Sequence, residues 1–330
     1  MILGTDKFVA CPLCSSQEHQ TLATRGRSKE DLHTAICTGC GLVFSSPIPS
    51  TEDIAEYYAK RYRIEYKGTT KPKLKHVYRA GMRALARLPV VEQFSAPGDR
   101  VQDIGSGGGE FVYLLETQGY QASGIEPDVG YGTHSLIEYG IDVSLDLYNS
   151  THVCENSFDL ITANHVVEHL RDPLEVFQGV YCSLRDEGHF IVEVPNVESM
   201  YHTPSNKWHF AHVFNFNSDT LENLGRRAGF EVVQTTLVGS CQHIQTVFKK
   251  SPRQVYMKVS HENYHRVKQT LDSYTDWDHF SSTMPARRLF LTLSNIVHEK
   301  LSVDVSLTGK EILDQLFAKS LSRYELQRAA

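Results

Sequence analysis

The chain lacks any apolar run long enough to cross a membrane. In its 330 residues, apolar side chains make up 41% and charged side chains 22%, which is ordinary for a soluble globular protein and excludes wholesale disorder. The first residues, MILGTDKFVACPLC, also lack the long apolar core of a signal peptide. We therefore expect a cytoplasmic protein without a membrane span.

Strong net charge is absent too. The 33 lysines and arginines and 39 acidic residues leave a formal charge of -6, which argues against general attraction to nucleic acid. The charge is unevenly distributed, because residues 60–87 hold ten lysines or arginines and one acid, Glu65. Part of this stretch has the apolar spacing of an amphipathic helix. We expect a solvated helix packed on a sheet; the alternative is a positive surface that attracts a phosphate-bearing substrate.

Cysteine is scarce, at seven residues, and four of the seven form two close pairs. The pairs read C-P-L-C and C-T-G-C-G, separated by 22 residues, which is close to the spacing of a four-thiolate zinc ribbon. Two disulfides are the alternative, which needs an oxidising compartment that nothing else in the sequence indicates. The predicted ligands of a structural zinc ion are Cys11, Cys14, Cys37 and Cys40. The remaining cysteines are scattered and are expected to be small buried side chains: Cys154, Cys182 and Cys241.

A glycine run follows the short apolar strand VQDI, which contains Asp103. Counted from Gly105, glycine occupies the first, third and fifth positions, and the helix-like segment EFVYLLETQG comes next. Strand, glycine turn and helix in this order form the first unit of a nucleotide-binding sheet, where the backbone can approach a ligand and the helix offers free N–H groups. A dinucleotide fingerprint requires glycine at the sixth position, which is Glu110 here. This absence argues against an NAD-dependent enzyme.

Polar residues also follow the next strand-like segments. QASGIEPD leads to Glu126, about twenty residues past the first glycine, where an acidic side chain can accept the hydroxyls of a ribose. SFDLITANH places Asn164 and His165 at the end of a buried strand, and GHFIVEVPN reads as a further strand. Because ligands of open α/β sheets bind at the carboxyl ends of the strands, we expect these residues at one edge of a sheet.

In series and in order over residues 98–250, these segments resemble class I S-adenosylmethionine (SAM) dependent methyltransferases, whose first motif is D-x-G-x-G-x-G. The resemblance implies an α/β fold, a Rossmann-like seven-stranded methyltransferase sheet with an antiparallel hairpin at its edge, and SAM as the cofactor. It implies that Asp103 and the glycines place the methionine part, Glu126 the ribose and Asp146 the adenine amino group. The residues expected to bind SAM are Asp103, Gly105, Ser106, Gly107, Gly109, Glu126, Asp146, Asn164 and His165.

A segment rich in histidine and aromatic residues, YHTPSNKWHFAHVFNF, follows the strand IVEVPN. It resembles the H-x-x-x-F, helix, A-G-F pattern of sugar and small-molecule methyltransferases. A base that deprotonates a substrate hydroxyl should titrate near neutral pH, as histidine does. The candidates are His209 and His212; the alternative is that they only hold a loop in place. His165 and His169 are four apart, a spacing that suits a metal ion, but the sequence offers no evident third ligand.

The cysteine pairs followed by this core resemble sugar-modifying methyltransferases of bacterial glycan and deoxysugar pathways. A carbon-methylating branch of that group carries glutamate before histidine near the acceptor, whereas WHFAHVF has none, which favours methylation of oxygen. The implied function is methyl transfer to a hydroxyl of a sugar, nucleotide sugar or glycan-related small molecule. The alternatives are a zinc-ribbon RNA methyltransferase and a non-catalytic scaffold that keeps the fold.

The chain is expected to divide into four parts. These are a zinc ribbon (1–49), a helical linker with substrate-side helices, including EDIAEYYAKRY (50–97), the methyltransferase core (98–250) and a helical C-terminal extension (251–330). In the extension, VYMKVSHENYHRVKQTLDSY and GKEILDQLFAKSLSRYEL have helical patterns, separated by Pro285 and a polar interval. The extension could pack on the sheet, cover the active site or mediate dimerisation, and the sequence does not choose among these.

Overall fold

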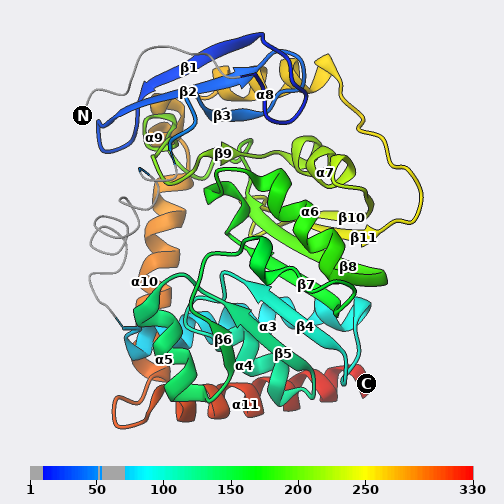
Figure 1. Ribbon diagram of the computed structural model, residues 1–330. Helices are drawn as coiled ribbons and strands as arrows, with labels where there is room; N and C mark the ends of the chain where they lie inside the picture. The colour runs from blue at the N-terminus through cyan, green and yellow to red at the C-terminus, as the bar shows by residue number, and fades with distance from the viewer. Residues whose placement is uncertain (1–9, 51–52, 54–70, 330) are drawn as a thin grey trace. The chain divides into compact units, whose positions relative to one another are not determined.

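The computed structural model describes residues 10–50, 53 and 71–329 (Figure 1). The expected helix over EDIAEYYAKRY and the first part of the basic stretch lie outside the described residues. The strands are β1 (His19–Arg25), β2 (Asp31–Cys37), β3 (Val43–Ser45), β4 (Arg100–Ile104), β5 (Gln121–Ile125), β6 (Asp142–Ser144), β7 (Phe158–Asn164), β8 (Leu184–Pro195), β9 (Phe214–Asn215), β10 (Phe230–Val238) and β11 (His243–Lys250). The α-helices are α3 (Leu74–Phe94), α4 (Glu110–Thr117), α5 (Val129–Tyr139), α6 (Pro173–Ser183), α7 (Ser218–Arg227), α8 (His261–Asp272), α9 (Asp276–Ser281), α10 (Met284–Ser302) and α11 (Gly309–Ala329), and the 3₁₀ helices are η2 (Ser150–His152), η3 (Val167–His169) and η4 (Pro204–Asn206).

Seven strands form one sheet in the order β10-β11-β8-β7-β4-β5-β6. β4 pairs in parallel with both β5 and β7, and β5 pairs in parallel with β6. β10 and β11 form an antiparallel hairpin at the edge. The order β6-β5-β4-β7-β8 is that of a doubly wound sheet, whose strand order reverses between β4 and β7. The predicted α/β, Rossmann-like seven-stranded sheet is therefore confirmed.

The central strands are apolar because the sheet is covered on both faces. Four of the five residues of β4 are buried, and in its register with β7, Val101 lies opposite Leu160 and Ile104 opposite Ala163. Parallel strands buried on both faces read as nearly continuous apolar runs rather than as alternating ones. VQDI and FDLITA follow that rule, with Asp103 as the polar exception.

The described chain forms two compact units. The first comprises the described residues of Met1–Tyr66 together with Asn164–Tyr181 and Phe190–Arg287. The second comprises those of Lys67–Ala163 together with Cys182–His189 and Arg288–Ala330. The first unit contains the four clustered cysteines and the histidine-rich segment, and the second contains the glycine run.

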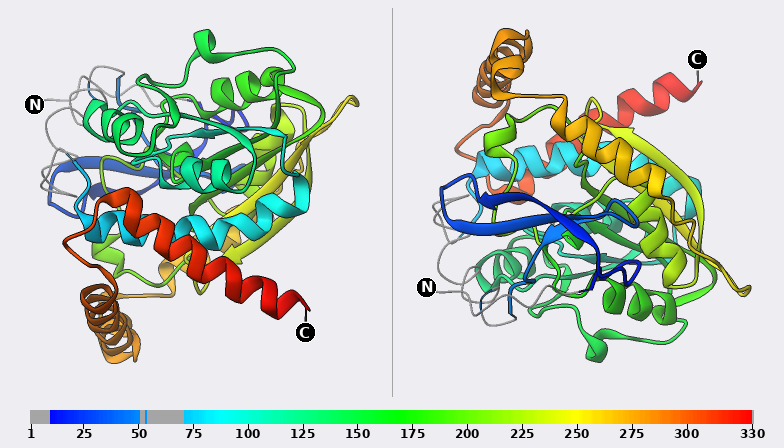
Figure 2. Two further views of the ribbon diagram at one scale, coloured as in Figure 1. Left: turned by 90° about the horizontal axis from the view of Figure 1, so that it is seen from below. Right: turned by 90° about the horizontal axis from the view of Figure 1, so that it is seen from above.

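In the second unit, α11 packs along α3 (Figure 2). A Cβ atom at Gly81 would lie 2.6 Å from Cδ2 of Leu313 and 2.9 Å from Cδ2 of Leu316, so the two helices approach closely because Gly81 has no side chain. Arg79 of α3 also donates to Glu299 of α10, with Nη2 2.7 Å from Oε2. The described part of the basic stretch is therefore a packed helix, as expected, but its main partners are helices and not the expected sheet. Its buried residues are Val77, Tyr78, Gly81, Ala84, Leu88 and Val91.

In the first unit, β1, β2, β3 and β9 form a four-stranded sheet. β3 follows the second cysteine pair directly in the sequence. β9 (Phe214–Asn215) lies near the end of the histidine-rich segment and pairs antiparallel with β3. α8 packs on this sheet (Figure 1), where Val267 joins Ile36, Val43 and Val197 in a buried apolar cluster. The cysteine-bearing sheet is thus completed by later parts of the chain.

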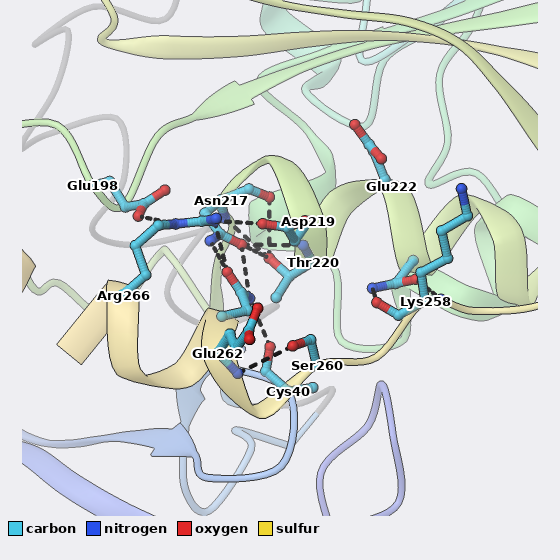
Figure 3. A network of polar contacts seen from close by, with 12 residues as sticks. Cys40, Glu198, Asn217, Asp219, Thr220, Glu222, Lys258, Ser260, Glu262 and Arg266 are labelled. Carbon is cyan, nitrogen blue, oxygen red and sulfur yellow. Dashed lines mark hydrogen bonds and ion pairs between the residues drawn. The ribbon is translucent and has the colours of Figure 1, made fainter. Parts of the chain in front are cut away.

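A buried amide network joins the second cysteine pair to α7 and α8 (Figure 3). Asn263 donates from Nδ2 to the carbonyl oxygen of Cys40 at 2.7 Å, and its Oδ1 accepts from Nδ2 of Asn217 at 2.7 Å. Asn217 caps α7, since its side chain accepts from the backbone N–H of Thr220. Arg266 donates to Oδ1 of Asn263 at 2.7 Å and to Glu198 at 3.0 Å. Asn263 is therefore at the centre of this network.

We expect Asn263→Ala to lower the free energy of unfolding by about 1–3 kcal/mol, because it leaves buried polar groups of Cys40 and Asn217 without their partner. The measurement is urea unfolding followed by circular dichroism. Gln269→Ala is the matched control, since Gln269 is exposed on the same helix. Equal midpoints for the two variants would show that the network does not stabilise the unit.

The C-terminal extension is helical, but its boundaries differ from the predicted ones. α8 begins at His261, because Ser260 caps it by accepting from the N–H of Glu262, so the predicted start near Val255 is wrong. α10 begins at Met284 and contains Pro285 in its first turn, where proline is tolerated because it interrupts no helical hydrogen bond. Proline therefore lies near the start of a helix instead of separating two helices. The predicted helix over GKEILDQLFAKSLSRYEL is confirmed as α11.

Two further findings concern expectations from composition. The prediction that the scattered cysteines are buried is wrong, because Cys154, Cys182 and Cys241 are all exposed. Over the ranges that the structure describes, no helix combines the length and apolarity that a membrane crossing requires.

Candidate functional site

The glycine run forms a left-handed loop between β4 and α4. Gly105, Gly107 and Gly109 have φ values of 72°, 60° and 84°, a region that residues with a side chain rarely adopt. Gly109 is also the N-cap residue of α4, and a Cβ atom there would lie 2.5 Å from Ile141 and Ser135. The three glycines are thus required by the backbone conformation, and the loop ends at a helix N-terminus.

Two buried acids hold this loop. Asp103 accepts from Oγ1 of Thr162 on the neighbouring strand at 2.6 Å. Glu126, after β5, accepts from the N–H of Gly107 at 2.8 Å through Oε2 and from the N–H of Asp128 at 2.8 Å through Oε1. Each carboxylate oxygen has a second lone pair that can accept another donor, so these bonds leave Glu126 able to accept ribose hydroxyls as well. The structure therefore brings Glu126 to the glycine loop.

The loop fits a nucleoside ligand on two observations. A Cβ atom at Gly107 would meet no atom within 4 Å, so the space beside that backbone is open. The hydroxyl oxygen of Ser106 is buried, and no protein group in the described chain hydrogen-bonds it. A loop with open space, an unpaired hydroxyl and an adjacent helix N-terminus can hold the carboxylate and ribose of SAM.

Asp146 and Asn164 lie at the ends of other strands. Asp146 follows β6 in an exposed turn, where its side chain accepts from the N–H of Leu147 at 2.7 Å and lies 3.9 Å from Nε2 of His152. Asn164 is the last residue of β7. The role of Asp146 at adenine and that of Asn164 at the cofactor stay predictions.

The four clustered cysteines meet in the first unit, with all four sulfur atoms within 4.8 Å of one another. The Sγ atoms of Cys11 and Cys40 are 3.6 Å apart and those of Cys14 and Cys37 are 3.5 Å apart. These distances are longer than the sulfur–sulfur bond of a disulfide, which is about 2.05 Å. Four sulfur atoms bound to a tetrahedral zinc ion at 2.3 Å are about 3.8 Å apart, which is close to these distances. The four thiols therefore fit a closed zinc site, with no position left for a substrate.

His165 lies in a strained position directly after β7. Its φ is 56°, which is uncommon for a residue with a side chain and is often found at functional sites. Its Nε2 is 3.0 Å from Oε1 of Glu193, and its Nδ1 is 3.5 Å from Oε1 of Glu168. Burial opposes the charged form, but the two carboxylates outweigh it and raise the pKa of His165 to about 9. His165 is therefore a cation at neutral pH.

His209 and His212 lie together, with ring centroids 3.9 Å apart. Burial is the largest cause that lowers the pKa of His209, and the neighbouring Arg27, His169 and His202 add to it, to give about 3. Burial and the neighbouring imidazoles also hold the pKa of His212 well below its ordinary value. Both rings are neutral at pH 7, so each has a lone pair, but each holds a proton less tightly than a free imidazole does.

A small cavity lies in the first unit, with one residue of the histidine-rich segment in its wall. Its volume is about 190 Å³, and its wall includes Phe210, the residue after His209. The rest of the wall comes from the cysteine-bearing sheet and the residues after it: Leu32, His33, Pro47, Ile48, Pro49, Ser50 and Asp53. The cavity is large enough for part of a small molecule.

Sequence reasoning missed several residues of these sites. Thr162 and Glu193 lie inside apolar strand segments, so a polar residue in a buried run is the signal that identifies them. His243 stacks edge-on against His165, with centroids 4.7 Å apart, and no motif contains it. Val167–His169 forms a 3₁₀ turn and α6 begins only at Pro173, so no α-helix carries both His165 and His169. His165 and His169 therefore do not lie one helical turn apart.

Residues 74–235 match a protein family described as "Methyltransferase domain". The chain has the fold of a class I SAM-dependent methyltransferase. No curated protein matches it. Among solved structures, a SAM-dependent methyltransferase from Thermotoga maritima is 22% identical, with 60% of this chain and 98% of that one covered and a TM-score of 0.44. The PH0226 protein from Pyrococcus horikoshii is 18% identical, with 58% and 99% covered and a TM-score of 0.47. A SAM-dependent methyltransferase from Aquifex aeolicus is 14% identical, with 55% and 100% covered and a TM-score of 0.43.

Proposed function

We propose that this protein transfers the methyl group of SAM to a hydroxyl group of a sugar, nucleotide sugar or glycan-related small molecule in the cytoplasm. The observation that carries the proposal is the glycine loop of the methyltransferase fold, with open space at Gly107 and Glu126 bound to its backbone. SAM supplies a methyl group already activated on a sulfonium. The protein has to bind it, orient the acceptor, remove the acceptor's proton and exclude water.

The cofactor residues in this proposal are those of the second unit that hold the loop. Gly105, Gly107 and Gly109 give the backbone its left-handed path, and the N–H groups at the start of α4 would bind the methionine carboxylate. Asp103 and Glu126 complete the set. Asn164, His165 and Asp146 remain proposed cofactor contacts.

The acceptor residues in this proposal belong to the first unit. The cavity lined by Phe210, the residue after His209 in the sequence, is the candidate space for part of a small acceptor. His209 and His212 are the candidate general bases, because neutral imidazoles can accept a hydroxyl proton. A phosphate on the acceptor and a dimer are also proposals, for which residues 71–87 and the C-terminal helices are the candidate regions. The absence of glutamate before either histidine favours oxygen over carbon as the methylated atom.

The test is methyl transfer from radiolabelled SAM to a panel of nucleoside-diphosphate sugars and free sugars, with transfer RNA as a comparison. We expect a labelled sugar product whose rate of formation does not fall steeply as the salt concentration rises. Transfer to RNA that falls steeply with salt would favour the RNA methyltransferase instead. Binding of S-adenosylhomocysteine without any turnover would favour the scaffold reading.

The pH dependence tests the base. If His209 accepts the proton, its pKa of about 3 keeps it neutral, so kcat/KM should not fall between about pH 8 and pH 5. His209→Asn should lower kcat by about 100-fold or more while leaving binding of S-adenosylhomocysteine unchanged. His202→Asn, at an exposed neighbouring histidine, is the control. An acid limb near pH 6.5 in the wild type would exclude a base with so low a pKa.

A further inference from the structure

Three side chains in the first unit place possible metal ligands close together. Glu168 and His169 lie in η3, and His212 lies in the loop between η4 and β9. One carboxylate oxygen and one ring nitrogen from each histidine all lie within 4.8 Å of one another. This is a separate set from the four cysteines, and sequence spacing alone does not reveal it, because the third ligand comes from a distant segment.

The orientation of His169 is that of a metal ligand. Its Nδ1 lies 2.7 Å from the carbonyl oxygen of Ala211. A carbonyl only accepts, so Nδ1 carries the hydrogen, and in the neutral ring Nε2 then has a lone pair. That Nε2 is 3.6 Å from Oε1 of Glu168, which is too long for a hydrogen bond. Histidines that bind metals commonly donate their other N–H to a backbone carbonyl in this way.

Glu168 is a buried carboxylate whose bonding is incomplete. Its side chain is 2% exposed. Its Oε2 is buried and has no hydrogen-bond partner among the described residues. Its Oε1 is 3.5 Å from Nδ1 of His165 and 3.6 Å from Nε2 of His169. His165 lies against Oε1, but Oε2 still lacks the hydrogen-bond donor or cation that a buried carboxylate oxygen requires.

The distances around Glu168 are those between ligands of one ion. Ligand atoms bound at 2.0–2.2 Å in a tetrahedron are about 3.3–3.6 Å apart. The 3.6 Å between Glu168 and His169 is at that value. The ring centroids of His169 and His212 are 4.9 Å apart, close enough for both rings to reach one ion.

We propose that Glu168, His169 and His212 bind a divalent first-row transition-metal ion, such as Zn²⁺ or Co²⁺. Two imidazole nitrogens and one carboxylate oxygen suit these ions better than Mg²⁺ or Ca²⁺, which prefer oxygen. Three protein ligands leave one coordination position open, as in catalytic zinc sites. His165 stays outside the set and pairs with Glu193 at 3.0 Å.

The site also bears on the acceptor, and this consequence rests on the proposed function. An acceptor hydroxyl at the open position would lose its proton more easily, because a bound metal ion lowers the pKa of a coordinated oxygen. As a ligand, His212 could not serve as the base at the same time. His209, next to it, would then be the base. Metal binding is tested without any acceptor, so the result does not depend on whether the protein transfers methyl groups.

The test is titration of Co²⁺ into the full-length protein that has been purified with zinc in its cysteine site. We expect one further equivalent to bind, with visible cobalt absorption but without thiolate-to-cobalt charge transfer. Glu168→Gln and His212→Asn should each weaken this binding by more than about 100-fold, since changes outside the first ligand shell alone cost about 10- to 100-fold. His202→Asn should bind as the wild type does.

Two results would overturn the proposal. One is wild-type protein that takes up no Co²⁺ beyond the cysteine site, which would make Glu168 and His169 an ordinary ion pair. The other is uptake that persists unchanged in both ligand variants, which would place the ion elsewhere. The wild-type titration decides the first question even if a variant does not fold.

Discussion

Gly107→Arg is expected to abolish binding of S-adenosylhomocysteine, with a loss of at least about 100-fold, or about 2.8 kcal/mol. The residue has a φ of 60°, and the space that a side chain would enter is open in the structure. That space is where the proposed cofactor has to lie against the backbone. Arginine would fill it, and its backbone would also pay about 1–2 kcal/mol for the left-handed conformation. Calorimetric titration measures the affinity.

Gly140→Arg is the matched control for this prediction. Gly140 has a φ of 72° at the end of α5, and a Cβ atom there would also meet nothing within 4 Å. The control therefore adds the same charge, bulk and backbone strain to the same unit, outside the glycine loop. Retained binding in Gly140→Arg with loss in Gly107→Arg assigns the effect to the loop. Normal binding in Gly107→Arg would remove SAM from this site and with it the proposed reaction.

Cys37→Ser is expected to abolish binding of the proposed zinc ion and to unfold the four-stranded sheet of the first unit. Cys37 is the last residue of β2, and its N–H donates to the carbonyl oxygen of Leu42 at 2.9 Å. The proposed zinc ligand is therefore also part of the turn between β2 and β3. Structural zinc contributes about 10–16 kcal/mol in small zinc-binding peptides. That is as large as the whole stability of a typical domain, about 5–15 kcal/mol.

The measurements for this variant are metal content and thermal unfolding. We expect one equivalent of zinc less than in the wild type, and loss of the thiolate-to-cobalt charge transfer when cobalt replaces zinc. Cys182→Ser is the control, because Cys182 is exposed and outside the cluster. A Cys37→Ser protein with unchanged zinc content and melting temperature would contradict a structural zinc site. The proposed site at Glu168 contains no thiolate, so the charge-transfer band separates the two sites.

Local geometry is the part of this protein that the sequence alone determined. The glycines of the run are needed at left-handed positions that other residues avoid, so Gly105, Gly107 and Gly109 identify the loop without any structure. The two cysteine pairs form knuckles within a few residues of chain, and the structure brings their sulfurs together as the spacing predicts. Apolar runs such as VQDI also identify buried strands, because a strand covered on both faces has consecutive apolar residues.

Contacts between distant segments were decided only by the tertiary structure. β9 completes the cysteine-bearing sheet, and Asn263 of α8 holds the carbonyl of Cys40. The sequence offered no third ligand beside His165 and His169, whereas the fold forms a 3₁₀ turn there and places His212 beside His169 and Glu168. Spacing along a chain reports only which side chains share one turn or one strand face. Which segments then meet depends on the packing of the whole unit. The lowered pKa of His209 and the raised pKa of His165 depend on that packing too, because burial and neighbouring groups cause both shifts.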